Sequence, residues 1–149
     1  MIKAKLIYIP ITKDTIEEYS KPIGALCSQP ANPENNKTKF LLFNNKMEFE
    51  YYMKMMGFDE EITNTVWKAK QFSTGSQNDI ITICTVPHMW RIGCYSVENI
   101  AIYNPNIYSL SKLCKYFRCK NYMKNIFVVS DLTLLPKECN KYNNEEKKE

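Results

Sequence analysis

Residues 99–130 read NIAIYNPNIYSLSKLCKYFRCKNYMKNIFVVS, and they contain two apolar runs separated by a segment of helical character. The runs, at residues 99–103 and 125–130, are typical of strands, and the second is typical of a strand covered on both faces. We expect the helix between them to begin at Asn104-Pro105, with Asn as its cap. Strand, helix and strand over about thirty residues predict a βαβ unit. The apolar face of the helix consists of Leu110, Leu113, Cys114 and Phe117.

Further strands are predicted upstream of this unit. Runs rich in apolar and β-branched residues at positions 3–9, 40–43 and 80–86 have the length and composition of strands. Polar stretches rich in Asn, Pro, Ser and Gly at 28–37 and 71–78 are expected to be loops.

Three further helix starts are predicted from capping residues. Thr12 is expected to cap a short helix after the first strand. Asn45, with Glu48 at the reciprocal capping position, predicts a helix that ends at Gly57. Asp59 predicts the next helix, which has acidic residues in its first turn as the helix dipole prefers. The inward stripe expected for this helix is Ile62, Val66 and Ala69.

The composition is that of a folded globular protein. The chain has 149 residues, of which 44% are hydrophobic and 24% are charged, and these values exclude a disordered or low-complexity chain. We expect an α/β or α+β fold with one domain over residues 1–139, a mixed sheet of four to six strands, packed helices and the C-terminal βαβ unit. Residues 140–149 are polar and are predicted to form a disordered tail.

The six cysteines are dispersed along the chain without the spacing of a disulfide framework. No apolar run reaches the roughly 20 residues that a membrane span needs, and the first residues do not have the pattern of a signal peptide. We therefore expect a cytoplasmic protein with reduced cysteines and no membrane partner.

The segment between Glu98 and Asp131 contains five basic residues and no acidic one. Clustered cations neutralise phosphates, and exposed aromatic rings stack on unpaired bases. The alternative is a solvated helix face backed by core aromatics. Lys112, Lys115 and Arg118 are expected to lie opposite the apolar face of the predicted helix. The full set of predicted nucleic-acid-binding residues is Lys112, Lys115, Arg118, Lys120, Lys124, Tyr116 and Tyr122.

Residues 47–56 form a Met- and Tyr-rich helix with more apolar side chains than one inward stripe requires. Adaptable Met-rich surfaces can bind proteins. Burial between a sheet and a second helix explains the same pattern, and we favour it. If the helix binds a protein partner, the expected contacts are Met47, Tyr51, Tyr52 and Met55.

The residues that could bind a metal or an anion, or act in catalysis, form no familiar motif. Cys84, His88 and Cys94 have the ligand types of a zinc site, but their spacing differs from that of close-set zinc ligands, and buried Cys often acts as a small hydrophobe. His88 is the only histidine, so a Cys–His nucleophile requires it. An anion site at Asn104-Pro105-Asn106, with Asp131 nearby, lacks a glycine-rich loop. We predict no metal, no cofactor and no catalytic residue.

Taken together, these patterns favour a non-catalytic binding protein. We expect it to dock on RNA, or on a ribonucleoprotein such as the ribosome, through the basic helix. The alternative is a protein-interaction domain that uses the Met- and Tyr-rich helix. A small enzyme is the third possibility, because a pocket assembled from distant residues leaves no trace in a single sequence.

Overall fold

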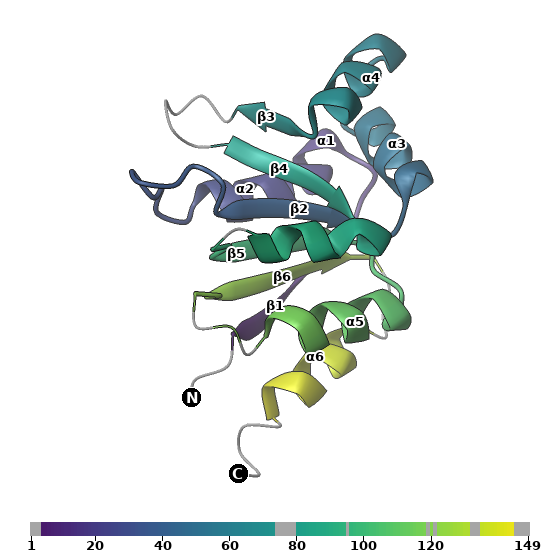
Figure 1. The fold of residues 1–149 in the computed structure, drawn as a ribbon. Coiled ribbons are helices and arrows are strands. Elements are labelled where there is room, and N and C mark those ends of the chain that lie inside the picture. The colour runs from purple at the N-terminus through teal and green to yellow at the C-terminus, as the bar shows by residue number, and fades with distance from the viewer. Residues whose placement is uncertain are drawn as a thin grey trace.

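Six strands form a single sheet in the computed structural model of the chain, which describes residues 4–73, 80–94, 96–118, 120, 122–131 and 135–144 (Figure 1). The strand order is β1-β6-β5-β2-β4-β3, and every neighbouring pair is parallel except β3 with β4. The strands are β1 (Lys5–Pro10), β2 (Lys39–Phe43), β3 (Gln71–Ser73), β4 (Ile80–Thr85), β5 (Asn99–Tyr103) and β6 (Asn125–Ser130).

Helices cover both faces of the sheet, because the central strands are apolar on both sides. Every residue of β2 and of β5 is buried. One face packs on α1 (Ile16–Tyr19), α2 (Lys21–Cys27), α3 (Lys46–Met55) and α4 (Glu60–Ala69). The other face packs on the 3-10 helix η1 (Val86–Cys94), α5 (Ile107–Phe117) and α6 (Leu135–Asn144). The predicted α/β class with a mixed sheet is confirmed, and β5, α5 and β6 form the predicted βαβ unit with parallel neighbouring strands.

The chain changes direction across the sheet between β2 and β5. From β2 it continues to β4 through α3 and α4, and from β5 it continues in the opposite direction to β6 through α5. The carboxyl ends of β2 and β5 are therefore a topological switch point, the place where open α/β sheets commonly bind ligands.

Two predicted helix caps are wrong by two or three residues, because the predicted capping residues bond elsewhere. Asn106 caps α5 by accepting a hydrogen bond from Ser109 N at 2.7 Å. Asn104 has a left-handed backbone, with φ 48°, and its side chain accepts a hydrogen bond from Ser130 Oγ at 2.7 Å. Thr15 rather than Thr12 caps α1.

Other predicted boundaries also need correction. The predicted inward stripe of α4 is wrong for Ile62 and Ala69, which are exposed, whereas Val66 packs against the core as predicted. The helix also buries Thr63, and its Trp67 ring packs against Phe49 with centroids 5.2 Å apart. Residues 71–73, expected to be in a loop, pair with β4. The rest of that predicted loop, residues 74–78, lies outside the described residues.

The predicted disordered tail is wrong for residues 140–144, which are the last part of α6. The helix is held against the first strand by Asn143. Its Oδ1 accepts a hydrogen bond from Leu6 N at 3.0 Å, and its Nδ2 donates one to Leu6 O at 2.9 Å. One polar side chain thus satisfies both backbone groups of a strand residue. Residues 145–149 lie outside the described residues.

Asn143→Ala is expected to lower the free energy of unfolding by about 1–3 kcal/mol, because it leaves two partly buried backbone groups of Leu6 without their partner. Urea unfolding followed by circular dichroism measures this change. Asn140→Ala is the matched control, since Asn140 is an exposed residue of the same helix. Equal destabilisation in the two variants would contradict the role given to Asn143.

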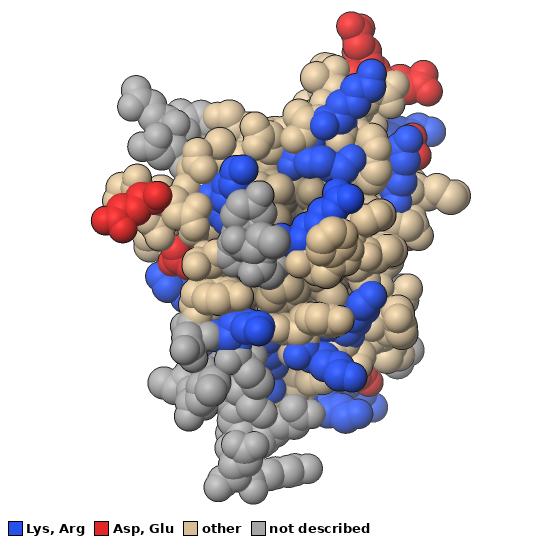
Figure 2. Space-filling view, in the orientation of Figure 1, with Lys and Arg blue, Asp and Glu red and all other residues tan. Residues whose placement is uncertain are grey.

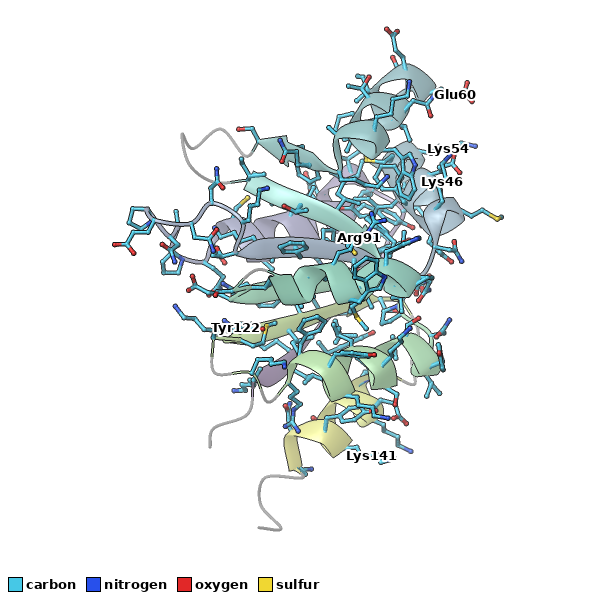
Figure 3. All side chains as sticks on the ribbon, viewed as in Figure 1. Lys46, Lys54, Glu60, Arg91, Tyr122 and Lys141 are labelled. Atoms are coloured by element: carbon cyan, nitrogen blue, oxygen red, sulfur yellow. The ribbon has the colours of Figure 1, made fainter. Side chains whose placement is uncertain are left out.

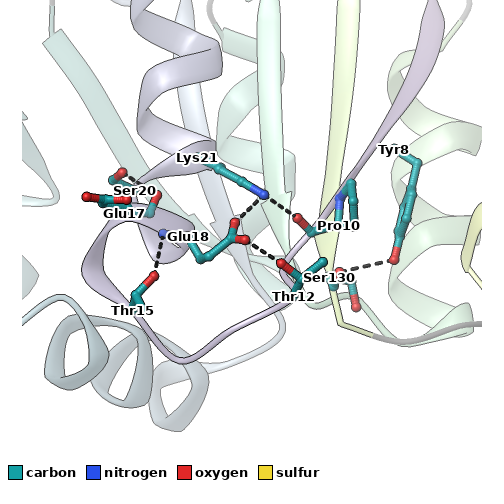
Figure 4. A network of polar contacts seen from close by, with 9 residues as sticks. All are labelled: Tyr8, Pro10, Thr12, Thr15, Glu17, Glu18, Ser20, Lys21 and Ser130. Carbon is teal, nitrogen blue, oxygen red and sulfur yellow. Dashed lines mark hydrogen bonds and ion pairs between the residues drawn. The ribbon is translucent and has the colours of Figure 1, made fainter.

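A polar network joins the end of β1 to α1 and α2 (Figure 4). The Glu18 carboxylate forms an ion pair with Lys21 and accepts a hydrogen bond from the Thr12 hydroxyl. Lys21 Nζ also donates to Pro10 O at 2.9 Å. The hydrogen bond from Lys21, followed by that from Thr12, lowers the pKa of Glu18 below its ordinary value of 4.5.

The Glu18 network predicts a pH-dependent contribution to stability. Because the pKa of Glu18 is lower in the folded state, its contribution is present above pH 4.5 and is lost as the pH falls through the folded pKa. The difference in unfolding free energy between wild type and Glu18→Gln should therefore shrink between about pH 5 and about pH 3. Glu17→Gln is the control. A difference that is constant over this range would rule out the network as its source.

Candidate nucleic-acid interface

Helix α5 presents an outward face of Tyr, Lys and Ser side chains. Asn106 sets the start of the helix, and its apolar side chains enter the core shared with η1 and α6. The buried residues of this face are Leu110, Leu113, Cys114 and Phe117, as predicted. Since these residues fix the rotation of the helix, Ser111, Lys115 and Tyr116 between them are exposed, and Lys112 is half-buried.

The outward face of α5 contains a groove of about 550 Å³. Tyr108 and Tyr116 are 71% and 50% exposed, which is unusual for rings of this size. Together with Lys112 they are spaced four residues apart, and so form one ridge of the helix. Ser111 and Lys115 form the neighbouring ridge. The groove, which we call the α5 groove, is therefore lined by two rings and two ammonium groups.

Basic side chains predominate among the described residues on the face that carries η1, α5 and α6. Figure 2 shows Lys and Arg atoms spread across this face, with the visible Asp and Glu atoms near its margin. Arg91 extends from η1 and Lys141 from α6 on the same face (Figure 3). Because few acidic groups lie among these cations in this view, their fields add rather than cancel.

The predicted nucleic-acid-binding residues do not all lie together. Lys112, Lys115 and Tyr116 line the α5 groove. Arg118 was predicted on the exposed face of the helix, and this is wrong: it is 3% exposed, and its Nε donates to Ala4 O at 3.2 Å. It is the C-cap of α5, after which the chain leads to β6.

The remaining three predicted residues lie between α5 and β6. Lys120 is exposed, whereas Tyr122 is half-buried. Lys124 forms an ion pair with Glu98 at 2.6 Å. Burial opposes ionisation of Glu98, but hydrogen bonds from Lys124 and Asn32 outweigh this effect and lower its pKa. Lys124 therefore already has an anionic partner, and Lys112 and Lys115 are the stronger candidates for phosphate contacts.

The switch point itself is acidic. A hollow of about 360 Å³ there is lined by residues that include Glu48, Tyr103, Asn104 and Asp131. The predicted anion site near Asn104 thus faces two carboxylates, which repel phosphate. A polyanion is better accommodated on the basic face than at this end of the sheet.

The sulfur and imidazole groups near η1 form hydrogen bonds with neighbouring residues. The Cys84 thiol donates hydrogen bonds to the carbonyls of Thr85 and His88, both at 3.4 Å. His88 Nδ1 is 3.1 Å from Thr85 Oγ1. The His88 imidazole is therefore engaged by a hydroxyl, and its backbone rather than its ring contacts Cys84. The described residues contain no group of three metal-ligating side chains. The Cys94 side chain lies outside the described part.

The buried thiols should react slowly in the native protein. Burial raises the pKa values of Cys84 and Cys139 to about 11. We expect iodoacetamide at about pH 8 to alkylate each at least about a hundredfold more slowly in the folded than in the urea-unfolded protein, because the thiolate reacts. Peptide mass spectrometry resolves the sites, with the exposed Cys27 as the internal control. Rapid native labelling of Cys84 would indicate an activated nucleophile instead.

The alternative protein-binding helix, α3, is divided between core and surface. Met47 is 78% exposed, whereas Tyr52 is 1% exposed and donates a hydrogen bond to Tyr19 O at 2.5 Å. Tyr51 is exposed and Met55 is half-buried. Of the predicted contacts, Tyr52 is inaccessible to a partner, while Met47 and Tyr51 remain accessible.

Sequence reasoning missed a second cationic cluster, formed by Lys70 at the end of α4 and by Arg91 on η1. Both line a hollow beside β4. Lys46 of α3 approaches the same indole ring as Lys70, that of Trp67. No spacing rule connects these residues, because they come from separate elements.

No helix in the described part of the chain has both the length and the apolar character needed to cross a membrane. Comparison of the sequence with protein-family models and with curated proteins finds no match. The function of the basic face must therefore be inferred from its own geometry and charge.

Proposed function

We propose that the protein binds single-stranded RNA, free or within a ribonucleoprotein such as the ribosome, through the α5 groove and the surrounding basic face. The observation that carries this proposal is the pairing of exposed Tyr108 and Tyr116 with Lys112 and Lys115 in one groove. Ammonium groups neutralise phosphates, while ring faces stack on bases.

A single strand fits this surface better than a duplex. Stacking on a tyrosine requires a base whose face is open, and duplex bases are already stacked on one another. The groove runs along one face of a helix whose other face is buried, so it offers a fixed row of rings and cations. Such a row favours sequence-tolerant binding, because every base has a ring face and every nucleotide has a phosphate.

The charge-reversal pair Lys112→Glu with Lys115→Glu should raise the Kd for a labelled RNA of about twelve nucleotides by more than tenfold. Fluorescence anisotropy over a salt series measures this change. The corresponding Ala pair should reduce the slope of log affinity against log salt by about 0.7 for each phosphate that the protein no longer neutralises. Circular dichroism must show unchanged helix content.

The control is Lys54→Glu with Lys68→Glu, which makes the same charge change at exposed positions on α3 and α4. A general effect of net charge would weaken binding equally in both pairs. Undiminished binding in the α5 pair would overturn the proposal. The exposed Met47 and Tyr51 of α3 would then be the next surface to test, with a protein partner.

The two rings give a separate test. Tyr108→Leu with Tyr116→Leu keeps the apolar bulk but removes the stacking surface, so the Kd should rise about tenfold while the salt slope stays unchanged. A changed slope would mean that the tyrosines position the lysines rather than stack on bases.

A further inference from the structure

A hollow of about 350 Å³ lies beside β4, separate from the α5 groove. Its described lining comes from β2, β4, η1 and the end of α4, and it shares no residue with the α5 groove. Phe40 and Cys84 belong to the core covered by η1 and α5, so the hollow opens on the same face of the sheet. None of its described lining residues is Asp or Glu.

Two strong bases converge on this hollow. Lys70 has a left-handed backbone, with φ 56°, and its Nζ donates to Trp67 O at 2.6 Å and lies 3.3 Å from the centre of the Trp67 ring. An ammonium has three donors, so the carbonyl of Trp67 leaves others for a ligand. Arg91 enters from η1. Burial, then Lys46 and Arg91, lower the pKa of Lys70, as expected where like charges meet without an anion.

A hydroxyl in the same lining is unsatisfied. Thr82 Oγ1 is shielded from solvent and has no hydrogen-bond partner among the described residues. A buried polar atom without a hydrogen-bond partner destabilises a protein unless a ligand or another group supplies that partner. The hydroxyl of the neighbouring Thr85 is already engaged by His88 Nδ1 at 3.1 Å.

We propose that this hollow binds a phosphate ester. Lys70 and Arg91 supply the charge that an anionic phosphate requires, and Phe40 and Trp67 supply apolar walls for the organic part. Rotation of the Thr82 side chain brings its shielded hydroxyl to the bound phosphate. The volume lies in the range of small-molecule pockets, roughly 300–1,000 Å³, which is more than a bare phosphate fills. The same chemistry is found in a free nucleoside phosphate and in one unit of a nucleic-acid strand.

The fluorescence of Trp67 should report whether a ligand occupies the hollow. The chain has two tryptophans, Trp67 and Trp90, so the Trp90→Phe variant leaves a single reporter in the wall of the hollow. Adenosine 5′-monophosphate, uridine 5′-monophosphate and phenyl phosphate should each change its fluorescence saturably at millimolar concentration. Adenosine should not, because it lacks the phosphate. No response to any of the three esters, or an equal response to adenosine, would overturn the proposal.

Three substitutions in the Trp90→Phe background assign the contacts. Lys70→Met and Arg91→Met should each weaken binding of adenosine monophosphate at least about tenfold, since each removes a charged donor. Lys68→Met, at an exposed position near the end of α4, should leave binding unchanged. Thr82→Val should weaken binding severalfold without lowering the thermal midpoint of the free protein, because it removes an unsatisfied hydroxyl. Unchanged affinity in both Met variants would overturn the site.

Competition separates the two sources of the phosphate ester. If the hollow receives a unit of a strand, a single-stranded RNA oligonucleotide displaces adenosine monophosphate; if it binds free esters, only mononucleotides do so. The Lys112→Glu with Lys115→Glu pair should retain binding of adenosine monophosphate in either case. Failure of the α5 groove to bind RNA is therefore distinguishable from failure of this hollow to bind a phosphate ester.

Discussion

The burial of β2 and β5 on both faces is the constraint on which the rest of the structure depends. Every residue of both strands is buried, so each face needs a helical layer, and the connections between parallel strands supply it. Polar chemistry is therefore displaced to the outer faces of helices, the ends of strands and the margins of the sheet. The α5 groove, the acidic hollow at the switch point and the hollow beside β4 occupy these three kinds of position.

Charge is segregated between these positions. The carboxyl ends of β2 and β5 meet Glu48 and Asp131, while the face that carries η1 and α5 presents Lys70, Arg91, Lys112 and Lys115. A phosphate-bearing ligand is repelled by the first region and attracted by the second. The orientation of such a ligand on the protein is thus restricted before any specific contact forms, because only one face lowers its electrostatic energy.

Local patterns were sufficient to predict most of the sheet and two of the four predicted helix caps. The predicted bounds of β5 and β6, and the caps Asn45 and Asp59, agree with the structure because each depends on neighbouring residues. Predictions failed where a distant partner decided the outcome. Asn104 bonds Ser130, 26 positions away, and Arg118 bonds Ala4, 114 positions away.

The candidate sites differ in the same way, because one lies on a single helix and the other is assembled from several elements. Lys112, Lys115 and Tyr116 of the α5 groove were accessible to sequence reasoning because one helix carries all of them. Lys70, Thr82 and Arg91 come from a helix end, a strand and a 3-10 helix, and no periodicity relates them. Their association follows from strand order, which a single sequence does not specify.

Arg118 and Asn143 also determine how the sheet terminates. β1 is an edge strand, and such edges are templates on which another chain can add a strand. Here the backbone of Ala4 is bonded by Arg118, that of Leu6 by Asn143, and Pro10 has no N–H and gives its carbonyl to Lys21. The last helix and the end of α5 therefore form hydrogen bonds with backbone groups of this edge that a seventh strand would otherwise bond. A chain cut before Asn143 would expose Leu6 on an apolar edge and invite edge-to-edge aggregation.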